Sequence, residues 1–177
     1  LDELLPRLEE AGHGLTLRSM GVESFSAAEN QRFNKGLSAE KVWACLDMLK
    51  DFERRYPRSF GVEDVGYFAM ILFTPWTTPK DLAVNIEAAR RLGDDLLEKA
   101  LGTRLQLWEG LAITELARHD GLLVDEPGAP SELVAVCISS PDFRELHWRF
   151  NDPRSERIFR LLIRLDPPPF TANFGDD

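Results

Sequence analysis

Cysteine and histidine are scarce in this 177-residue chain, which limits the metal chemistry that it can perform. Cys45 and Cys137 are separated by 92 positions, and His13, His119 and His147 are scattered. Protein metal sites usually draw Cys or His ligands from positions close together in the sequence. We therefore predict no metal site made by this chain and assign the histidines no catalytic role. We expect both thiols to be reduced and buried, as in a cytoplasmic protein.

Positive charge and long apolar runs are also in short supply. The 30 acidic residues outnumber the 21 Lys and Arg residues, which gives a net charge of −9. Nucleic-acid binding depends on clustered Lys and Arg. The longest apolar run, Val65 to Phe73, has nine residues, whereas a helix needs about 20 to cross a bilayer. We therefore expect neither a nucleic-acid partner nor a membrane partner.

The remaining composition allows about one good-sized core. Hydrophobic residues make up 44% of the chain, which suits one domain with an appendage. Residues 125–130, with the sequence Asp-Glu-Pro-Gly-Ala-Pro, have a linker composition and no hydrophobic period. We therefore divide the chain into a main unit, residues 1–124, and an accessory, mainly helical segment, residues 125–177.

Several segments combine an apolar period of helical spacing with capping residues. Ser38 and Thr78 can each cap a helix, and the prolines after Thr78 and Asp152 suit a first helical position. Apolar residues then recur three or four positions apart. We predict helices over residues 1–11, 38–55, 78–92, 94–101 and 111–119, and another that begins at residue 152.

Three further segments are typical of β-strands: Leu15 to Val22, Gly66 to Phe73 and Arg104 to Trp108. The second is apolar almost throughout, as in a central parallel strand. The strands alternate with the predicted helices, and such alternation indicates parallel strands joined by right-handed crossovers. The sequence therefore predicts an α/β fold.

Polar groups follow the first predicted strand. Glu23 and Ser24 stand at its end, and Lys35 follows twelve residues after Glu23. Barrel enzymes place ligand-binding groups at the carboxyl ends of their strands, so we predict a ligand site here. The alternative is a surface ion pair between Glu23 and Lys35.

Two tryptophans fall at the ends of the other predicted strands. Trp76 and Trp108 could close a substrate pocket or stack on a flat substrate. Packing beneath loops is an equally good interpretation of both side chains.

Three motifs resemble those of radical S-adenosylmethionine (radical SAM) enzymes. Residues 17–25 (Leu-Arg-Ser-Met-Gly-Val-Glu-Ser-Phe) with Asn34-Lys35-Gly36 resemble their fourth strand and the loop after it. Residues 70–78 and 104–112 resemble the fifth and sixth strands with their proline and glycine turns. The likeness spans about residues 4–124 and is nearest to coproporphyrinogen oxidase-like and cobalamin-binding members.

The resemblance implies a partial (β/α) barrel of parallel strands with a small helical C-terminal extension. It also implies that S-adenosylmethionine is cleaved at a 4Fe-4S cluster to a 5′-deoxyadenosyl radical, which modifies a small-molecule or peptide substrate. Cobalamin is a further cofactor that the resemblance allows. The CxxxCxxC loop that ligates the cluster is absent from this sequence. We therefore expect the chain to be a fragment that works with an amino-terminal region carrying that loop.

The resemblance assigns roles to five residues. Glu23 would bind the ribose or amino group of S-adenosylmethionine, supported by Ser24, and Lys35 would pair with its carboxylate. Ile71 would lie against the adenine, and the backbone at Leu107 would hydrogen-bond to it. Without the resemblance, Ile71 and Leu107 are interpreted as core residues.

The sequence is also compatible with two other functions. One is a degenerate barrel that serves as a binding or scaffold module, and the other is an unrelated (β/α) barrel enzyme. The sequence assigns no catalytic residue under any of these hypotheses.

Overall fold

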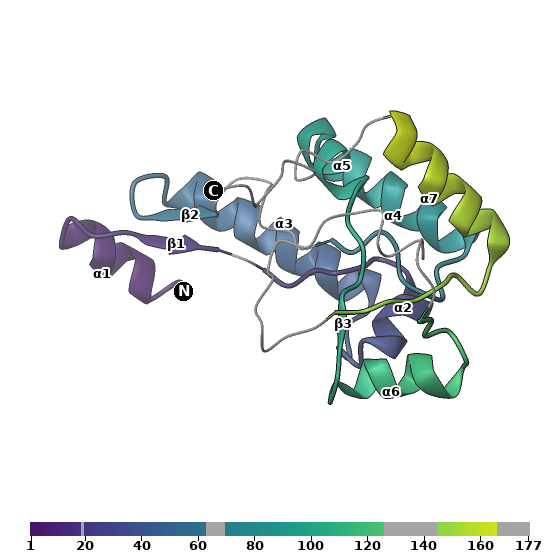
Figure 1. Ribbon diagram of the computed structural model, residues 1–177. Helices are drawn as coiled ribbons and strands as arrows, with labels where there is room; N and C mark the ends of the chain where they lie inside the picture. The colour runs from purple at the N-terminus through teal and green to yellow at the C-terminus, as the bar shows by residue number, and fades with distance from the viewer. Residues whose placement is uncertain (19, 63–69, 126–144, 166–177) are drawn as a thin grey trace, which may run out of the picture.

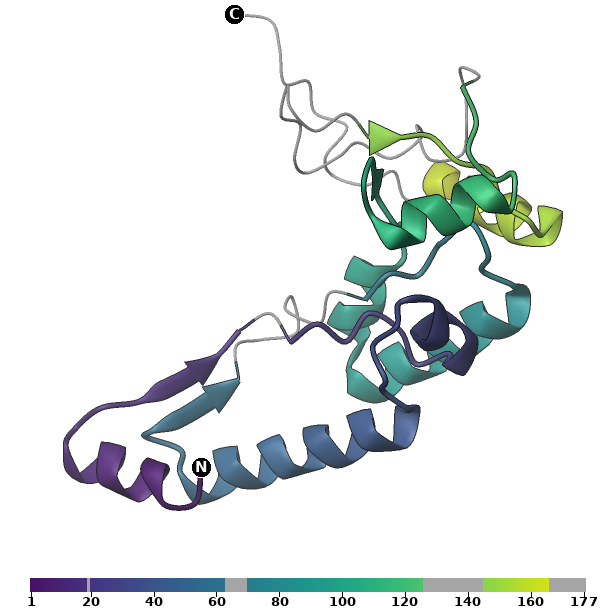
Figure 2. The same ribbon diagram turned by 90° about the horizontal axis from the view of Figure 1, so that it is seen from below.

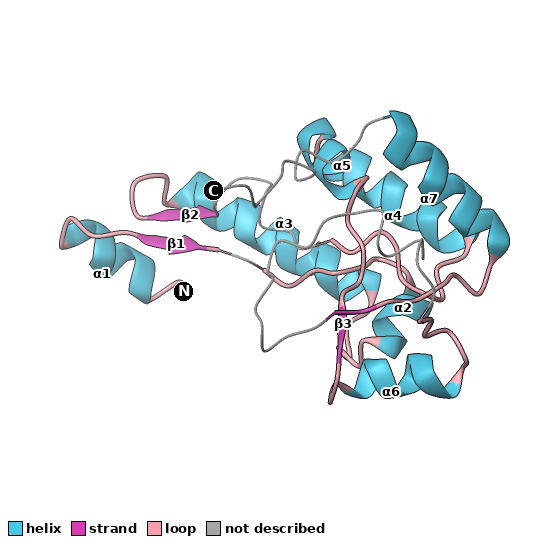
Figure 3. Ribbon diagram, viewed as in Figure 1, coloured by secondary structure: helices cyan, strands magenta, loops and turns pink. Residues whose placement is uncertain are grey.

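The computed structural model describes residues 1–18, 20–62, 70–125 and 145–165 (Figure 1). Helices predominate over strands in this part of the chain (Figure 3). The helices are α1 (Leu4–Glu10), α2 (Ala27–Arg32), α3 (Ala39–Arg55), α4 (Pro79–Leu92), α5 (Asp94–Ala100), α6 (Ala112–His119) and α7 (Pro153–Leu165). The strands are β1 (Leu15–Leu17), β2 (Phe60–Val62), β3 (Leu107–Trp108) and β4 (Glu145–Leu146).

The predicted partial (β/α) barrel is wrong. Within the described ranges, β1 pairs with β2 in parallel, whereas β3 pairs with β4 in the antiparallel direction. Each of these two sheets has two strands. A (β/α) barrel requires a continuous series of parallel strands. Because an antiparallel strand from the C-terminal segment pairs with β3, no such series forms here.

The predicted strands are also shorter than expected. The first extends over Leu15–Leu17 rather than to Val22, and the third is reduced to β3. Most of the predicted strand Gly66–Phe73 lies outside the described residues, but its last residue, Phe73, forms a parallel bridge with Arg104. Apolar content therefore indicated burial correctly at Phe73, which is 0% exposed, without a regular strand.

The predicted helices are confirmed, and their capping residues explain where they begin. Ser38 caps α3 by accepting a hydrogen bond from the backbone N–H of Lys41. At α4, Thr78 and Asp81 form a reciprocal capping box, with Pro79 at the first helical position. These signals depend on neighbours within one helical turn, so they can be recognised in the sequence.

Helix α3 buries one face, and Cys45, which was predicted to lie on that face, does not. Its buried residues are Val42, Leu46, Leu49 and Phe52, spaced three or four positions apart. Cys45 is exposed, so the prediction of a buried thiol is wrong there. One position along a helix turns a side chain by about 100°, which carries Cys45 away from the face that contains Leu46. Cys137 lies outside the described residues.

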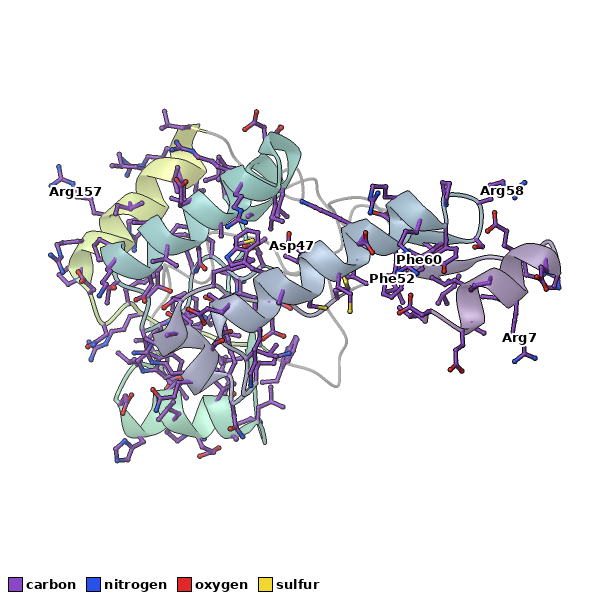
Figure 4. The ribbon with its side chains drawn as sticks, turned by 180° about the vertical axis from the view of Figure 1, so that it is seen from behind. Arg7, Asp47, Phe52, Arg58, Phe60 and Arg157 are labelled. Atoms are coloured by element: carbon purple, nitrogen blue, oxygen red, sulfur yellow. The ribbon has the colours of Figure 1, made fainter. Side chains whose placement is uncertain are left out.

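A small lobe projects from the remaining helices. Figures 1 and 2 show it built from α1, β1, β2 and the adjoining end of α3. Its core contains Leu5, Leu49, Phe52 and Phe60. Phe52 and Phe60 lie together in Figure 4, with ring centroids 5.8 Å apart in an edge-to-face arrangement. This lobe has a hydrophobic cluster of its own.

The largest cluster joins the main unit to the C-terminal segment. Trp148, Phe150 and Phe159 pack there with Leu72 and Phe73, among others. The Phe73 and Phe159 ring centroids are 4.8 Å apart. The Trp148 indole also donates a hydrogen bond to the Leu105 carbonyl over 2.9 Å. The described part of residues 125–177 thus contributes to the principal core.

Candidate functional site

The three segments that carry the sequence motifs lie side by side. The Ile71 N–H donates to the Glu23 carbonyl over 2.8 Å. The Phe73 N–H donates to the Thr103 carbonyl over 3.2 Å, and the Leu105 N–H donates to the Phe73 carbonyl over 2.7 Å. Backbone hydrogen bonds therefore connect the first motif to the second and the second to the third.

Glu23 and Lys35 form an ion pair, with Nζ of Lys35 2.8 Å from Oε1 of Glu23. Their side chains are 22% and 34% exposed, respectively, so solvent reaches both charges. Asn34 and Gly36, on either side of Lys35, have φ angles of 53° and 61°. Asn and Gly are the residues that adopt this left-handed conformation most readily, which explains how the turn after α2 presents Lys35.

Ser24 does not face the solvent with Glu23. It is 1% exposed, and its hydroxyl donates to Oδ1 of Asn85 and accepts from the Ser26 N–H, both over 3.1 Å. Its hydroxyl therefore holds the loop from inside the protein. The Ser24 side chain can therefore affect a ligand only indirectly, by fixing the position of this loop.

Ile71 and Leu107 occupy different environments. Ile71 is half-buried and packs against the largest core cluster, next to Glu23 through its backbone hydrogen bond. Leu107 is 0% exposed, and its strand pairs with β4, with Leu146 directly opposite. The structure thus brings Ile71 close to Glu23, whereas Leu107 lies within a paired strand.

Trp76 is a core residue. It is 6% exposed, and its indole N–H donates to Oδ2 of Asp120 over 2.8 Å. The Arg32 guanidinium lies over its ring, 5.7 Å from the centroid. Trp108 is half-buried, and its buried indole nitrogen has no hydrogen-bond partner among the described atoms. The packing interpretation therefore describes Trp76, which belongs to the largest core cluster.

Sequence reasoning missed a buried carboxylate, that of Glu29, whose hydrogen-bonding partners Thr74 and Thr77 flank Trp76. Glu29 on α2 is 1% exposed and accepts hydrogen bonds from Thr74 Oγ1 over 2.9 Å and from Thr77 Oγ1 over 3.1 Å. The guanidinium of Arg32 lies 3.5 Å away. Burial raises the pKa of Glu29, although Arg32 and the two threonine hydroxyls oppose this effect. Oε2 has no hydrogen-bond partner in the described structure.

Asp81 on α4 is the second buried acidic residue in this part of the protein. Glu29, Asp81 and the polar side chains around them form a buried polar network. Asp81 accepts hydrogen bonds from the hydroxyls of Ser26 and Thr78 and from the Thr78 N–H. Burial by itself would raise the pKa of Asp81, but these hydrogen bonds outweigh it and lower the pKa below its ordinary value. The two buried carboxyl groups therefore have pKa values displaced in opposite directions.

Two asparagines complete the network from opposite sides. Asn30 on α2 donates from Nδ2 to the Ser24 carbonyl over 2.9 Å. Asn85 on α4 accepts at Oδ1 from the Phe25 N–H over 2.7 Å and from the Ser24 hydroxyl. The Ser26-x-x-Glu29 spacing could have indicated the start of α2. Nothing local could have indicated burial of Glu29, because its partners lie 45 and 48 positions away.

The described residues do not fit an iron–sulfur cluster. Such clusters take cysteine thiolates as ligands, and Cys45 is exposed on α3 without a second cysteine in the described ranges. No group of three His, Cys, Asp or Glu residues that could hold a metal ion occurs there either. No described feature is specific for cobalamin.

Among the helices that the structure describes, none is long and apolar enough to span a bilayer. Comparisons with models of protein families, with curated proteins and with solved structures found no match.

Proposed function

We propose that this chain is part of a radical SAM enzyme and binds S-adenosylmethionine beside Glu23 and Lys35. The observation that carries the proposal is the set of backbone hydrogen bonds that joins residues 23, 71–73 and 103–105. The resemblance places three motifs in one cofactor site, and these hydrogen bonds bring the same three segments together. Neighbouring motifs are 30 to 50 residues apart in the sequence, so their contact supports the proposal independently.

The chemistry of the ion pair suits the amino-acid end of the ligand. S-adenosylmethionine carries an α-carboxylate, an α-ammonium group and a sulfonium. Lys35 would bind the carboxylate, and Glu23 would accept a hydrogen bond from the ammonium or the ribose. The 2.8 Å ion pair between them has to open for this exchange. Exposed pairs typically contribute about 0.2–1 kcal/mol, so the ligand can replace the contact at little cost.

The surroundings provide an apolar surface next to the charges. Ile71 is half-buried and adjacent to Glu23 in the hydrogen-bonded set, which suits contact with the adenine.

The cluster that would supply an electron must be held by residues other than those described, because the cysteines do not fit it. Exposed Cys45 suits a reducing compartment, which favours a cytoplasmic location.

The direct test is titration of the purified 177-residue chain with S-adenosylmethionine by calorimetry. Lys35→Gln removes the cation and keeps most of the side chain. Lys41→Gln removes an exposed cation from the first turn of α3 and serves as the matched control. A hydrogen bond to a charged group is worth about 1.5–3 kcal/mol, so Lys35→Gln should weaken binding by at least about tenfold.

Failure of the unsubstituted chain to bind S-adenosylmethionine would contradict the proposal. Binding that is equally strong in Lys35→Gln and Lys41→Gln would remove Lys35 from the site. A third titration with free methionine examines the amino-acid end alone. It should compete with S-adenosylmethionine if Glu23 and Lys35 recognise that end.

A further inference from the structure

We propose that Asn30 is a positioning residue that sets the spacing between Glu23 and Lys35. Its side chain reaches the first of these segments, because Nδ2 donates to the carbonyl of Ser24 over 2.9 Å. Its backbone reaches the second, because its carbonyl accepts from the N–H of Lys35 over 3.3 Å. One residue thus holds the chain next to Glu23 and the chain at Lys35.

The hydrogen bond from the Asn30 side chain to the Ser24 carbonyl is shielded from water. Asn30 is 4% exposed and Ser24 is 1% exposed, so water does not readily replace the amide as a donor to the Ser24 carbonyl. A buried acceptor left without a partner destabilises the folded state. Asparagine is also a poor helix former, yet it stands inside the short helix α2. Its position is explained by the hydrogen bond and not by helix propensity.

Asn85 holds the same segment from the side of α4. Its Oδ1 accepts from the Phe25 N–H and from the Ser24 hydroxyl, while Asn30 donates to the Ser24 carbonyl. Two buried amide side chains therefore fix residues 24–25. Asn85 binds the Phe25 N–H and the Ser24 hydroxyl, and Asn30 binds the Ser24 carbonyl. Glu23 directly precedes this segment, so its backbone has little freedom to move away from the turn that carries Lys35.

Two features fix the turn at Lys35: the backbone conformation of its own residues and a hydrogen bond to Asn30. Asn34 and Gly36 adopt left-handed φ angles, and the Lys35 N–H bonds back to Asn30. Movement of α2 would therefore carry Lys35 with it. Loss of the Asn30 amide should loosen the Glu23 side of the pair first, since the backbone carbonyl of residue 30 remains in any variant.

Asn30→Asp tests this role with a change that can be reversed by pH. At neutral pH an ionised aspartate cannot donate to the Ser24 carbonyl, whereas a protonated carboxyl can. Burial raises the pKa of a carboxyl group, so the donor should return on mild acidification. Gln31→Asp, on the exposed neighbour in α2, adds the same charge without touching Ser24 and is the control.

The first readout needs no ligand. NMR signals of the Lys35 ammonium report its ion pair, and in Asn30→Asp they should broaden or shift at pH 7.5 and return toward the unsubstituted spectrum near pH 5.5. The unsubstituted protein and Gln31→Asp should show no such recovery. Protonation of Glu29, whose pKa is raised by burial, contributes to all three proteins and is removed by this comparison. Asn30→Ala, which deletes the donor without adding charge, should show the pH 7.5 change at both pH values.

The second readout rests on the proposed function. Asn30→Asp should bind S-adenosylmethionine at least about tenfold more weakly than Gln31→Asp at pH 7.5, a difference of about 1.4 kcal/mol, and should recover at pH 5.5. Lys35 signals that are identical in Asn30→Asp, Asn30→Ala and the unsubstituted protein would overturn the positioning role. The predicted NMR changes without any binding of S-adenosylmethionine by the unsubstituted chain would uphold that role and reject the proposed function.

Discussion

Glu29→Gln should change the way in which the stability of this protein depends on pH. The glutamate is 1% exposed, and Oε2 has no hydrogen-bond partner in the described structure. Its nearest cation, Arg32, lies 3.5 Å away with a side chain that is 28% exposed. Desolvation therefore dominates and raises the pKa of Glu29 above its ordinary value of 4.5. Glutamine keeps the shape and removes the charge.

The sign and the upper limit of the effect follow from proton linkage. Because the folded state has the higher pKa, it retains the proton of Glu29 at pH values where the unfolded chain has lost it. The stability from this group is complete below pH 4.5 and is lost as pH rises through the folded-state pKa. One proton allows a slope of at most about 1.4 kcal/mol per pH unit. Glu29→Gln should lack this slope and gain stability relative to the unsubstituted protein as pH rises.

Urea unfolding measured at half-unit steps from pH 4.5 to 7.5 checks this prediction. Glu98→Gln, on an exposed residue of α5, controls for the change in net charge. The difference in unfolding free energy between Glu29→Gln and the unsubstituted protein should rise with pH, while the Glu98→Gln difference stays flat. Parallel curves for Glu29→Gln and the unsubstituted protein would refute the reasoning. A difference that falls with rising pH would show that the Arg32 contact outweighs desolvation.

Three further substitutions test other parts of the structure. Arg104→Met should lower the free energy of unfolding by about 3–5 kcal/mol, because it leaves Glu145, 8% exposed, as a buried charge without its partner; urea denaturation measures this, and Arg104→Met/Glu145→Leu should recover much of the loss. Phe159→Ala should cost about 3–5 kcal/mol, because its ring is 0% exposed against Phe73 and Phe150; a loss under about 1 kcal/mol by the same method would mean that α7 does not pack on this core. The folded state lowers the pKa of Asp81 below its ordinary value of 3.8, so the ionised carboxylate stabilises the fold at pH values above 3.8. This contribution disappears as pH falls through the folded-state pKa. Asp81→Asn should therefore lose less stability than the unsubstituted protein upon acidification below pH 3.8, as followed by circular dichroism in urea; an equal loss would contradict the assignment.

Helix positions could be predicted because their signals are local. Ser38 and Thr78 each accept a hydrogen bond from a backbone N–H three positions ahead, so the capping residues and the helix that they cap appear together in the sequence. Cys45 was misplaced because a change of one position around a helix moves a side chain from the buried face to the exposed face.

Strand pairing and the polar network could not be predicted in the same way. The antiparallel partner of β3 comes from residues 145–146, and no local pattern indicates which distant segment completes a pair. Helix α2 was missed because its sequence, Ala-Ala-Glu-Asn-Gln-Arg, has no apolar period. It is held by polar contacts, and the partners of Glu29 and Asn85 lie 45 to 61 positions away. Side-chain type alone assigns such residues to the surface.

The packing of the C-terminal segment also has a consequence for synthesis on the ribosome. Leu72, Phe73 and Leu107 belong to a cluster whose aromatic partners are Trp148, Phe150 and Phe159. During translation the first group emerges well before the second, because Trp148 lies 41 positions after Leu107 and 75 positions after Phe73. The apolar surface of the first group stays uncovered while those residues are added. Exposed apolar surface of this kind favours aggregation and chaperone binding. The lobe of α1, β1, β2 and α3 has its own small core and can be assembled from residues 1–62 before that interval begins.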